Sequence, residues 1–173
     1  PLIPTLTVKQ LEYLAPADSK LRQLEQAGRF RKDILRVGSW NVQGETWDVT
    51  PQTLRDLKNN FDVGKSRGLD CPVVWNHSGD VRDRCGLVES LSIDGDTLVA
   101  EFAATNTDDV PKLVNSGGVS VQVREPFIDG IGNTYPLMLT HLGIVNHPVI
   151  PGQGPFRELS LESKGAKRMR YAT

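Results

Sequence analysis

The stretch that decides the fold is residues 117–152, GGVSVQVREPFIDGIGNTYPLMLTHLGIVNHPVIPG. It predicts two strands joined by a turn-rich connection. Residues 119–124 alternate strictly between valine and polar side chains, which is typical of a strand with one buried face. Residues 137–145 are almost continuously apolar and predict a second, more deeply buried strand. The connection between them contains Asp-Gly and Gly-Asn, both strong turn dipeptides.

Two polar residues on these strands point to chemistry. Ser120 lies on the polar face of the first strand, together with Gln122 and Arg124, and His141 lies in the middle of the apolar second strand. A buried imidazole needs a hydrogen-bond partner or a chemical task, because burying it unpaired costs free energy. A serine on the polar face of a nearby strand could meet both needs.

Bulk properties exclude several classes of protein. A length of 173 residues suits one domain with a single core. The net charge is −1, so we expect neither a nucleic-acid partner nor attraction to an acidic membrane. No apolar run approaches the roughly 20 residues of a membrane span. The amino end also lacks the basic and apolar regions of a signal peptide.

The chain has two cysteines, Cys71 and Cys85, which are too few for a disulfide scaffold and lack CxxC spacing. We expect both to be reduced thiols in a cytosolic setting. His77 lies between them in the sequence, so a thiol nucleophile paired with that histidine is a less favoured alternative.

The rest of the chain predicts short strands and helices around the central pair of strands. Strands are expected over residues 34–42, 72–77, 86–93 and 97–103, and helical segments over residues 5–28, 50–61 and 108–115. Because hairpins dominate after residue 84, we expect an α+β, mainly β fold. Its antiparallel, barrel-like sheet would have about six strands, with short helices packed outside. We divide the chain into an N-terminal helical arm (1–33), a β domain (34–156) and a basic C-terminal tail (157–173).

The three histidines, His77, His141 and His147, are few enough for their placement to be informative. Nucleophilic catalysis by serine needs a base within hydrogen-bond reach and a third group that orients the base. Ser120 as nucleophile, His77 as general base and His141 as the orienting third member would satisfy that requirement from three strands of one sheet. Candidate donors for an oxyanion are the backbone amides at Gly117 and Gly118 and the side chain of Arg124.

Each of these residues also has a simpler interpretation. A strand serine is most often a polar-face residue, and a histidine in an apolar strand is most often a hydrogen-bonded core residue. A three-histidine zinc site is disfavoured, because His141 and His147 are six residues apart in an extended segment and therefore lie roughly 20 Å apart. We expect no cofactor and no metal. Solvated loop positions are expected for Asp80, Asp83 and Asp94.

The run WNHSGDVRDRCGLVESLSIDGDTLVAEF (75–102), followed by GGVSVQV (117–123) and LTHLGIVNHPVIPG (139–152), resembles the prohead (capsid maturation) proteases of tailed phages. The likeness is to the Mu-like protease I group, which is related in fold to the herpesvirus assemblins, and it covers residues 34–156. It implies a serine endopeptidase that cuts scaffold and capsid-protein precursors, and often itself, inside the immature shell. The implied location is the phage prohead or virion in the bacterial cytoplasm, with self-association in the manner of the assemblins.

Carried over by position, the resemblance implies that His77 is the general base, Ser120 the nucleophile and His141 the third member of the triad. Many phage relatives have an acidic residue at the third position, whereas the herpesvirus enzymes have Ser, His and His. A neutral imidazole orients the base less strongly than a carboxylate, so slow turnover is expected. Many relatives also have a small residue soon after the serine, where this chain has Val121 and Gln122.

The resemblance leaves a second function open. A decoration or cement protein of the phage head could use the same protease-derived fold without cutting. The apolar amino-terminal segment and the basic tail, with Lys164, Lys167, Arg168 and Arg170, would suit such a structural role. The intact set of serine and two histidines favours the enzyme, because a protein that does not cut would be free to lose at least one of them.

Overall fold

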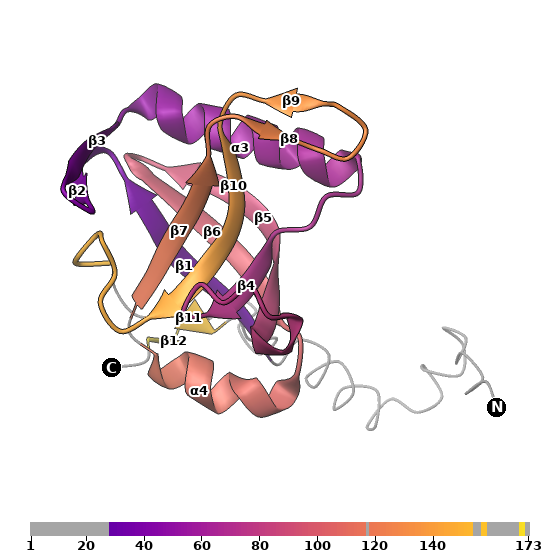
Figure 1. The fold of residues 1–173 in the computed structure, drawn as a ribbon. Helices are drawn as coiled ribbons and strands as arrows, with labels where there is room; N and C mark the ends of the chain where they lie inside the picture. Colours follow the sequence, from indigo (N-terminus) through magenta and orange to yellow (C-terminus); the bar gives the residue numbers. More distant parts are fainter. Residues whose placement is uncertain (1–27, 117, 154–156, 159–169, 172–173) are drawn as a thin grey trace, which may run out of the picture.

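The two strands predicted on either side of the turn-rich connection are neighbours in one sheet (Figure 1). The computed structural model describes residues 28–116, 118–153, 157–158 and 170–171. The predicted amino-terminal helical segment, apart from Gly28, and most of the predicted basic tail lie outside these residues. The strands are β1 (Arg29–Arg36), β2 (Gly38–Val42), β3 (Glu45–Val49), β4 (Pro72–Trp75), β5 (Arg84–Asp94), β6 (Thr97–Ala104), β7 (Gly118–Arg124), β8 (Phe127–Ile128), β9 (Thr134–Tyr135), β10 (Met138–Val145), β11 (Arg157–Glu158) and β12 (Arg170–Tyr171). The α-helices are α3 (Pro51–Ser66) and α4 (Val110–Asn115), with single 3-10 turns at Val81–Asp83 and Thr107–Asp109.

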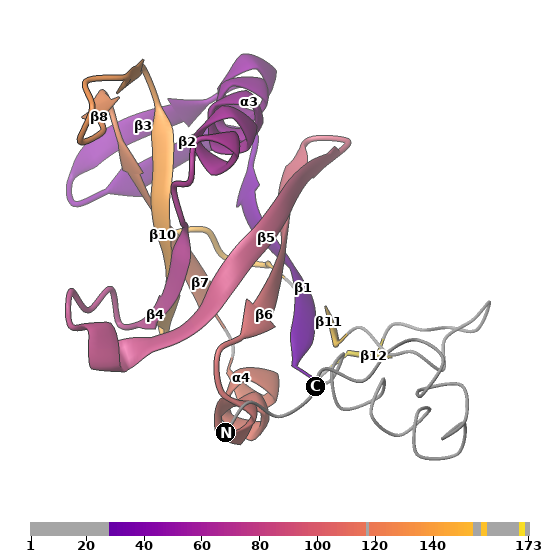
Figure 2. The same ribbon diagram turned by 90° about the vertical axis from the view of Figure 1, so that its right-hand side faces the viewer.

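Six strands form a curled, mixed half-barrel in the order β1-β6-β5-β4-β10-β7, and the two-residue strands β11 and β12 extend it beyond β1. The predicted mainly-β α+β class is confirmed. The expectation of an antiparallel sheet is wrong at one position, because β4 and β10 run parallel. β5 pairs with one edge of β4 in the antiparallel direction, and β10 pairs with the other edge in the parallel direction. The far edge of β10 pairs with β7, again antiparallel. Helices α3 and α4 lie at opposite ends of the sheet (Figures 1 and 2).

Helix α3 begins where the sequence predicts and ends later. Thr50 accepts a hydrogen bond from the backbone of Thr53 and forms a reciprocal capping box with it, and Pro51 occupies the first turn. The predicted end at Phe61 is wrong, because the helix continues to Ser66. Its last turn contains Gly64, which is buried so closely against the Met138 side chain that a Cβ atom there would lie 2.6 Å from it. None of the helices that the structure describes combines the length and apolar character of a membrane span.

The single strand predicted over residues 34–42 is two strands. The chain breaks after β1 at Gly38, whose φ of 155° lies in the region that favours glycine. The Trp40 ring packs where a Cβ of Gly38 would lie, and its indole N–H donates to the carbonyl of Arg36. The turn therefore sends β2 away from the main sheet, and β2 pairs with β3 in a separate two-stranded sheet.

The core fills the inside of the half-barrel with side chains from its six strands and from α3. The stacked rings of Phe30 and Phe102, with centroids 5.4 Å apart, lie within it. The predicted hairpin of β5 and β6 is confirmed, with the turn at residues 95–96. The turn-rich connection between β7 and β10 contains a small hairpin, β8–β9, which the sequence did not predict.

Candidate active site

The register between β7 and β10 places Ser120 directly opposite Gly143. Directly opposite residues of an antiparallel pair point their side chains to the same face, with Cβ atoms about 5 Å apart. His141 lies two residues before Gly143 and is opposite Gln122, so it shares this face. Ser120 and His141 therefore belong to one surface of the sheet, and both are partly exposed on it.

The ring of His77 lies on the same surface, over Gly143. A Cβ atom added to Gly143 would be 2.6 Å from both the Cε1 and the Nδ1 atoms of His77. Only a glycine leaves room for the ring at this point, because real Cβ contacts are longer than this distance. The imidazole of His77 thus occupies the position of a side chain directly across from Ser120. Among the described residues, the Ser120 hydroxyl itself makes no hydrogen bond.

The two imidazoles form a pair. The Nδ1 atom of His77 lies 2.7 Å from the Nε2 atom of His141, within hydrogen-bond distance, and the ring centroids are 4.9 Å apart. This contact uses one nitrogen of each ring and leaves Nε2 of His77 for another partner. If His77 acts as a base through Nε2, its Nδ1 must carry the proton and donate it to His141.

An unusual backbone conformation brings His77 back over the sheet. Asn76 and His77, which follow the last residue of β4, have positive φ angles of 52° and 56°. Residues other than glycine rarely adopt positive φ angles, although Asn and His tolerate them better than most. Two hydrogen bonds hold the turn: the backbone N–H of Asn76 donates to the carbonyl of Ile144, and that of Ser78 donates to the carbonyl of Trp75. Such strain is often found at functional sites.

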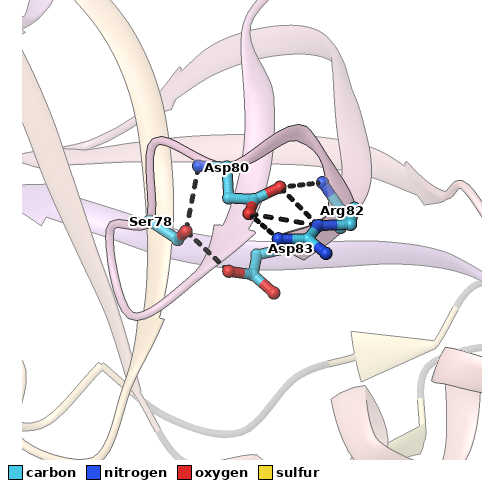
Figure 3. Close-up of polar contacts among 4 residues, drawn as sticks. All are labelled: Ser78, Asp80, Arg82 and Asp83. Atoms are coloured by element: carbon cyan, nitrogen blue, oxygen red, sulfur yellow. Dashed lines mark hydrogen bonds and ion pairs between the residues drawn. The ribbon is translucent and has the colours of Figure 1, made fainter.

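The loop after His77 is held by a cluster of charged and polar groups (Figure 3). The Ser78 hydroxyl donates to the carboxylate of Asp83 at 2.6 Å and accepts from the backbone N–H of Asp80 at 3.0 Å. The guanidinium of Arg82 donates to both carboxylate oxygens of Asp80, and these hydrogen bonds lower the pKa of that carboxyl. Asp80 and Asp83, predicted as merely solvated, therefore fix the course of the chain that follows His77.

Burial lowers the pKa of both histidines. For His77 the cause is partial burial of the ring, which disfavours its charged form. For His141 burial is again the largest cause, followed by the charge of His77 and then by that of Arg124. Both rings are thus biased toward the neutral form that a general base requires before reaction.

The candidate oxyanion donors occupy different places. Gly117 lies outside the described residues. Gly118 begins β7, two residues before Ser120, and is buried so tightly that a Cβ atom would lie 2.6 Å from Pro148. Arg124 lies at the far end of β7, roughly 13 Å along the strand from Ser120, and its charge acts on His141. Of these groups, Gly118 is the nearer to the serine.

A cleft of about 450 Å³ lies between the end of β4, the end of β10 and helix α4. Asn76, which precedes His77, lines it together with the end of β10 and one side of α4. The lining residues are Ile144 and Val145 of β10, Asn146 just after it, Pro111, Lys112 and Asn115 of α4, Ser116 just after it, and Trp75 at the end of β4. Ser120, His77 and His141 do not line this cleft; Asn76, the residue before His77, is its connection to them along the chain.

The remaining candidate residues lie away from this surface or are unreactive. Cys71 and Cys85 are buried free thiols, and burial raises the pKa of each to about 12, which disfavours a thiolate nucleophile. His147 is exposed beyond the end of β10, and no group of three or more metal-binding side chains occurs in the part of the chain that the structure describes. Asp94 is exposed at the end of β5.

The sequence did not single out Gly143 and Gln153. A lone glycine in the apolar strand LTHLGIV is a signal for close approach of another group, and it could have marked the position of Gly143. Gln153 binds the backbone of Val119, immediately before Ser120, and no sequence pattern indicates this contact. Comparison of this chain with protein-family models, curated proteins and solved structures finds no match.

Proposed function

We propose that this protein is a serine endopeptidase with Ser120 as nucleophile, His77 as general base and His141 as orienting third member. One observation carries the proposal: the His77 ring lies over Gly143, directly across from Ser120, and bonds through Nδ1 to His141. The three residues to which we assign these roles thus lie on one surface and come from three separate strand regions. Enzymes that transfer acyl groups through a serine commonly use such a set of groups.

In the proposed reaction, the Ser120 oxygen attacks the carbonyl carbon of the scissile peptide bond while its proton passes to Nε2 of His77. The resulting imidazolium is stabilised by its Nδ1–H, which donates to His141. The negative charge develops on the carbonyl oxygen, for which the amides at the start of β7 are candidate donors. When the C–N bond breaks, His77 returns the proton to the leaving amine. Water then gives a proton to His77 and attacks the acyl carbon, and as the ester bond breaks His77 returns that proton to the Ser120 oxygen.

The finer architecture and the biological setting belong to the same proposal. A curled, mainly antiparallel sheet with helices at its ends is compatible with the prohead protease and assemblin-like fold that the motifs resemble. On this proposal the substrates are scaffold and capsid-protein precursors, and possibly the protein itself, inside the phage prohead. The neutral third member predicts slow turnover, which suits an enzyme that cuts a limited number of confined substrates.

The direct test is to incubate the protein with its scaffold and capsid precursors in assembled proheads and to look for fragments by gel electrophoresis. We expect fragments with the wild type and none with Ser120→Ala. Ser92→Ala, which changes an exposed serine on β5, is the matched control and should cut normally. Absence of fragments with the wild type would contradict the proposal and favour the alternative, a non-catalytic decoration or cement protein.

A further inference from the structure

The chain that follows β10 crosses the open side of the half-barrel. We call residues 148–153 the bridging segment. Pro148 packs against Gly118 at the start of β7, and Ile150 is buried in the core. The guanidinium of Arg36, the last residue of β1, donates to the carbonyl of Pro151. The bridging segment therefore contacts both β7 and β1, two strands that do not pair with each other.

The bridging segment ends on β7 with Gln153, whose side-chain amide binds one residue in both directions. Its Oε1 atom accepts from the backbone N–H of Val119 at 2.9 Å, and its Nε2 atom donates to the carbonyl of Val119 at 2.6 Å. Gln153 is only 7 % exposed. The acceptor and the donor of this buried amide are both hydrogen-bonded. The arrangement of Gln153 and Val119 is therefore strongly favoured, because leaving either group unpaired would cost free energy.

This contact occupies the outer edge of β7. In an antiparallel pair, backbone groups of successive residues point alternately toward and away from the partner strand. Since the N–H and C=O of Val119 bind Gln153, those of Ser120 face β10, where its partner is Gly143. Within the described ranges β7 ends the sheet, so the amide of Gln153 takes the place of a neighbouring strand at this one residue.

The same contact fixes the backbone of the candidate nucleophile. The carbonyl of Val119 and the N–H of Ser120 belong to one planar peptide unit. Gln153 holds the carbonyl of this unit from outside the sheet, while β10 faces its N–H from inside. Rotation of the peptide unit would tilt the Cα–Cβ bond of Ser120 relative to the His77 ring, and small displacements of a nucleophile reduce the rate steeply.

We propose that Gln153 is a positioning residue for Ser120, which sets the direction of the serine side chain toward His77 through the peptide unit 119–120. The inference rests on the proposed function of Ser120. Gln153 does not touch the reacting atoms; it acts through Val119. Its removal should therefore slow the attack of Ser120 without weakening the binding of substrate.

The test compares Gln153→Glu and Gln153→Met with the wild type, with Gln43→Glu as the matched control in an exposed turn. Glutamate keeps the acceptor for Val119 N–H but, when ionised, cannot donate to its carbonyl. Methionine keeps the side-chain volume and loses both hydrogen bonds. The readouts are kcat and KM for a precursor peptide that the wild type cuts, the rate of Ser120 labelling by a fluorophosphonate, and the melting midpoint.

At pH 8 we expect both Gln153 variants to lower kcat and the labelling rate about 10-fold to 100-fold, with KM within about twofold of the wild type. The loss of kcat and of labelling rate in Gln153→Glu, relative to the wild type, should become smaller as pH falls, because the protonated acid regains a donor. The loss in Gln153→Met should stay the same as pH falls, because methionine has no group that gains a proton. Gln43→Glu should match the wild type throughout.

Wild-type kcat and labelling in both Gln153 variants would overturn the inference. So would losses that follow unfolding at the assay temperature in both variants, since Gln153 would then be only structural. Absence of cleavage and of Ser120-dependent labelling in the wild type would overturn the proposed function, and the inference with it.

Discussion

The Nδ1 atom of His77 and the Nε2 atom of His141 lie 2.7 Å apart, although the two residues are 64 positions apart in the chain. His77 lies in a strained turn after β4, and His141 lies on a strand that is otherwise mostly apolar. The contact engages Nδ1 of His77 and leaves its Nε2 available for a different partner.

The two histidines should differ in their importance for catalysis. We expect His77→Ala to lower kcat/KM at least about 1,000-fold, because the general base is removed. His141→Ala should leave a measurable remainder, with a loss of about 10-fold to 100-fold, because an orienting group matters less than the base. Cleavage kinetics on a precursor peptide measure both, and the exposed His147→Ala serves as control. Equal losses in the first two variants would refute the assigned roles.

Replacement of Gly143 by alanine should displace the His77 ring. The added methyl would lie 2.6 Å from ring atoms, so either the ring or the strand must move. We expect a loss of activity similar to that of His77→Ala and a decrease of about 1–3 kcal/mol in the free energy of unfolding. Urea denaturation and the cleavage assay check the two effects. Gly130→Ala, at a glycine with open space around it, should change neither; full activity of Gly143→Ala would show that the ring position is unimportant.

The loop cluster of Figure 3 should support the base indirectly. Ser78→Ala removes the donor to Asp83 and the acceptor for the N–H of Asp80. We expect the free energy of unfolding to fall by about 1 kcal/mol and activity to fall severalfold, because the turn that carries His77 loses its support. Thermal unfolding and cleavage rates measure both, with Ser92→Ala as the control. Unchanged activity would mean that Ile144 and Trp75 alone hold the turn.

The pH dependence should reflect the neutral histidines. Burial lowers the pKa of His77, so the ring stays neutral, and able to accept a proton, below its ordinary pKa of 6.5. We expect kcat/KM to decrease as pH falls, with a midpoint below 6.5. Stability should decrease over the same window, since the unfolded chain binds protons there that the folded chain does not. A midpoint above 6.5 in the rate profile would contradict the stated effect of burial.

The cysteines should be inert in the folded protein. Both are buried, and burial raises each pKa to about 12, so almost no thiolate exists at pH 8. We expect iodoacetamide to modify neither Cys71 nor Cys85 until denaturant is added, with mass spectrometry as the measurement. Cleavage activity should survive the treatment. Rapid modification with loss of activity would instead support a thiol nucleophile.

The local parts of this structure follow from the sequence, and the long-range parts do not. The alternation of residues 119–124 and the helical pattern of residues 50–61 predicted β7 and the start of α3, because these signals depend only on near neighbours. The parallel pairing of β4 with β10 leaves no trace in local periodicity. The functions of Gly143 and Gln153 also depend on contacts with distant residues, His77 and Val119, so the two residues were not singled out from their own surroundings.

The parallel pairing of β4 with β10 has a consequence for folding order. β4 and its turn are synthesised early, and the strand that completes the histidine pair follows some 60 residues later. Contacts of such large sequence separation form late in folding, because a long loop must close first. A growing chain therefore carries Ser120 and His77 before it carries His141, the proposed orienting partner of His77. If the proposed activity holds, it would arise only at a late stage of folding, once His141 has paired with His77.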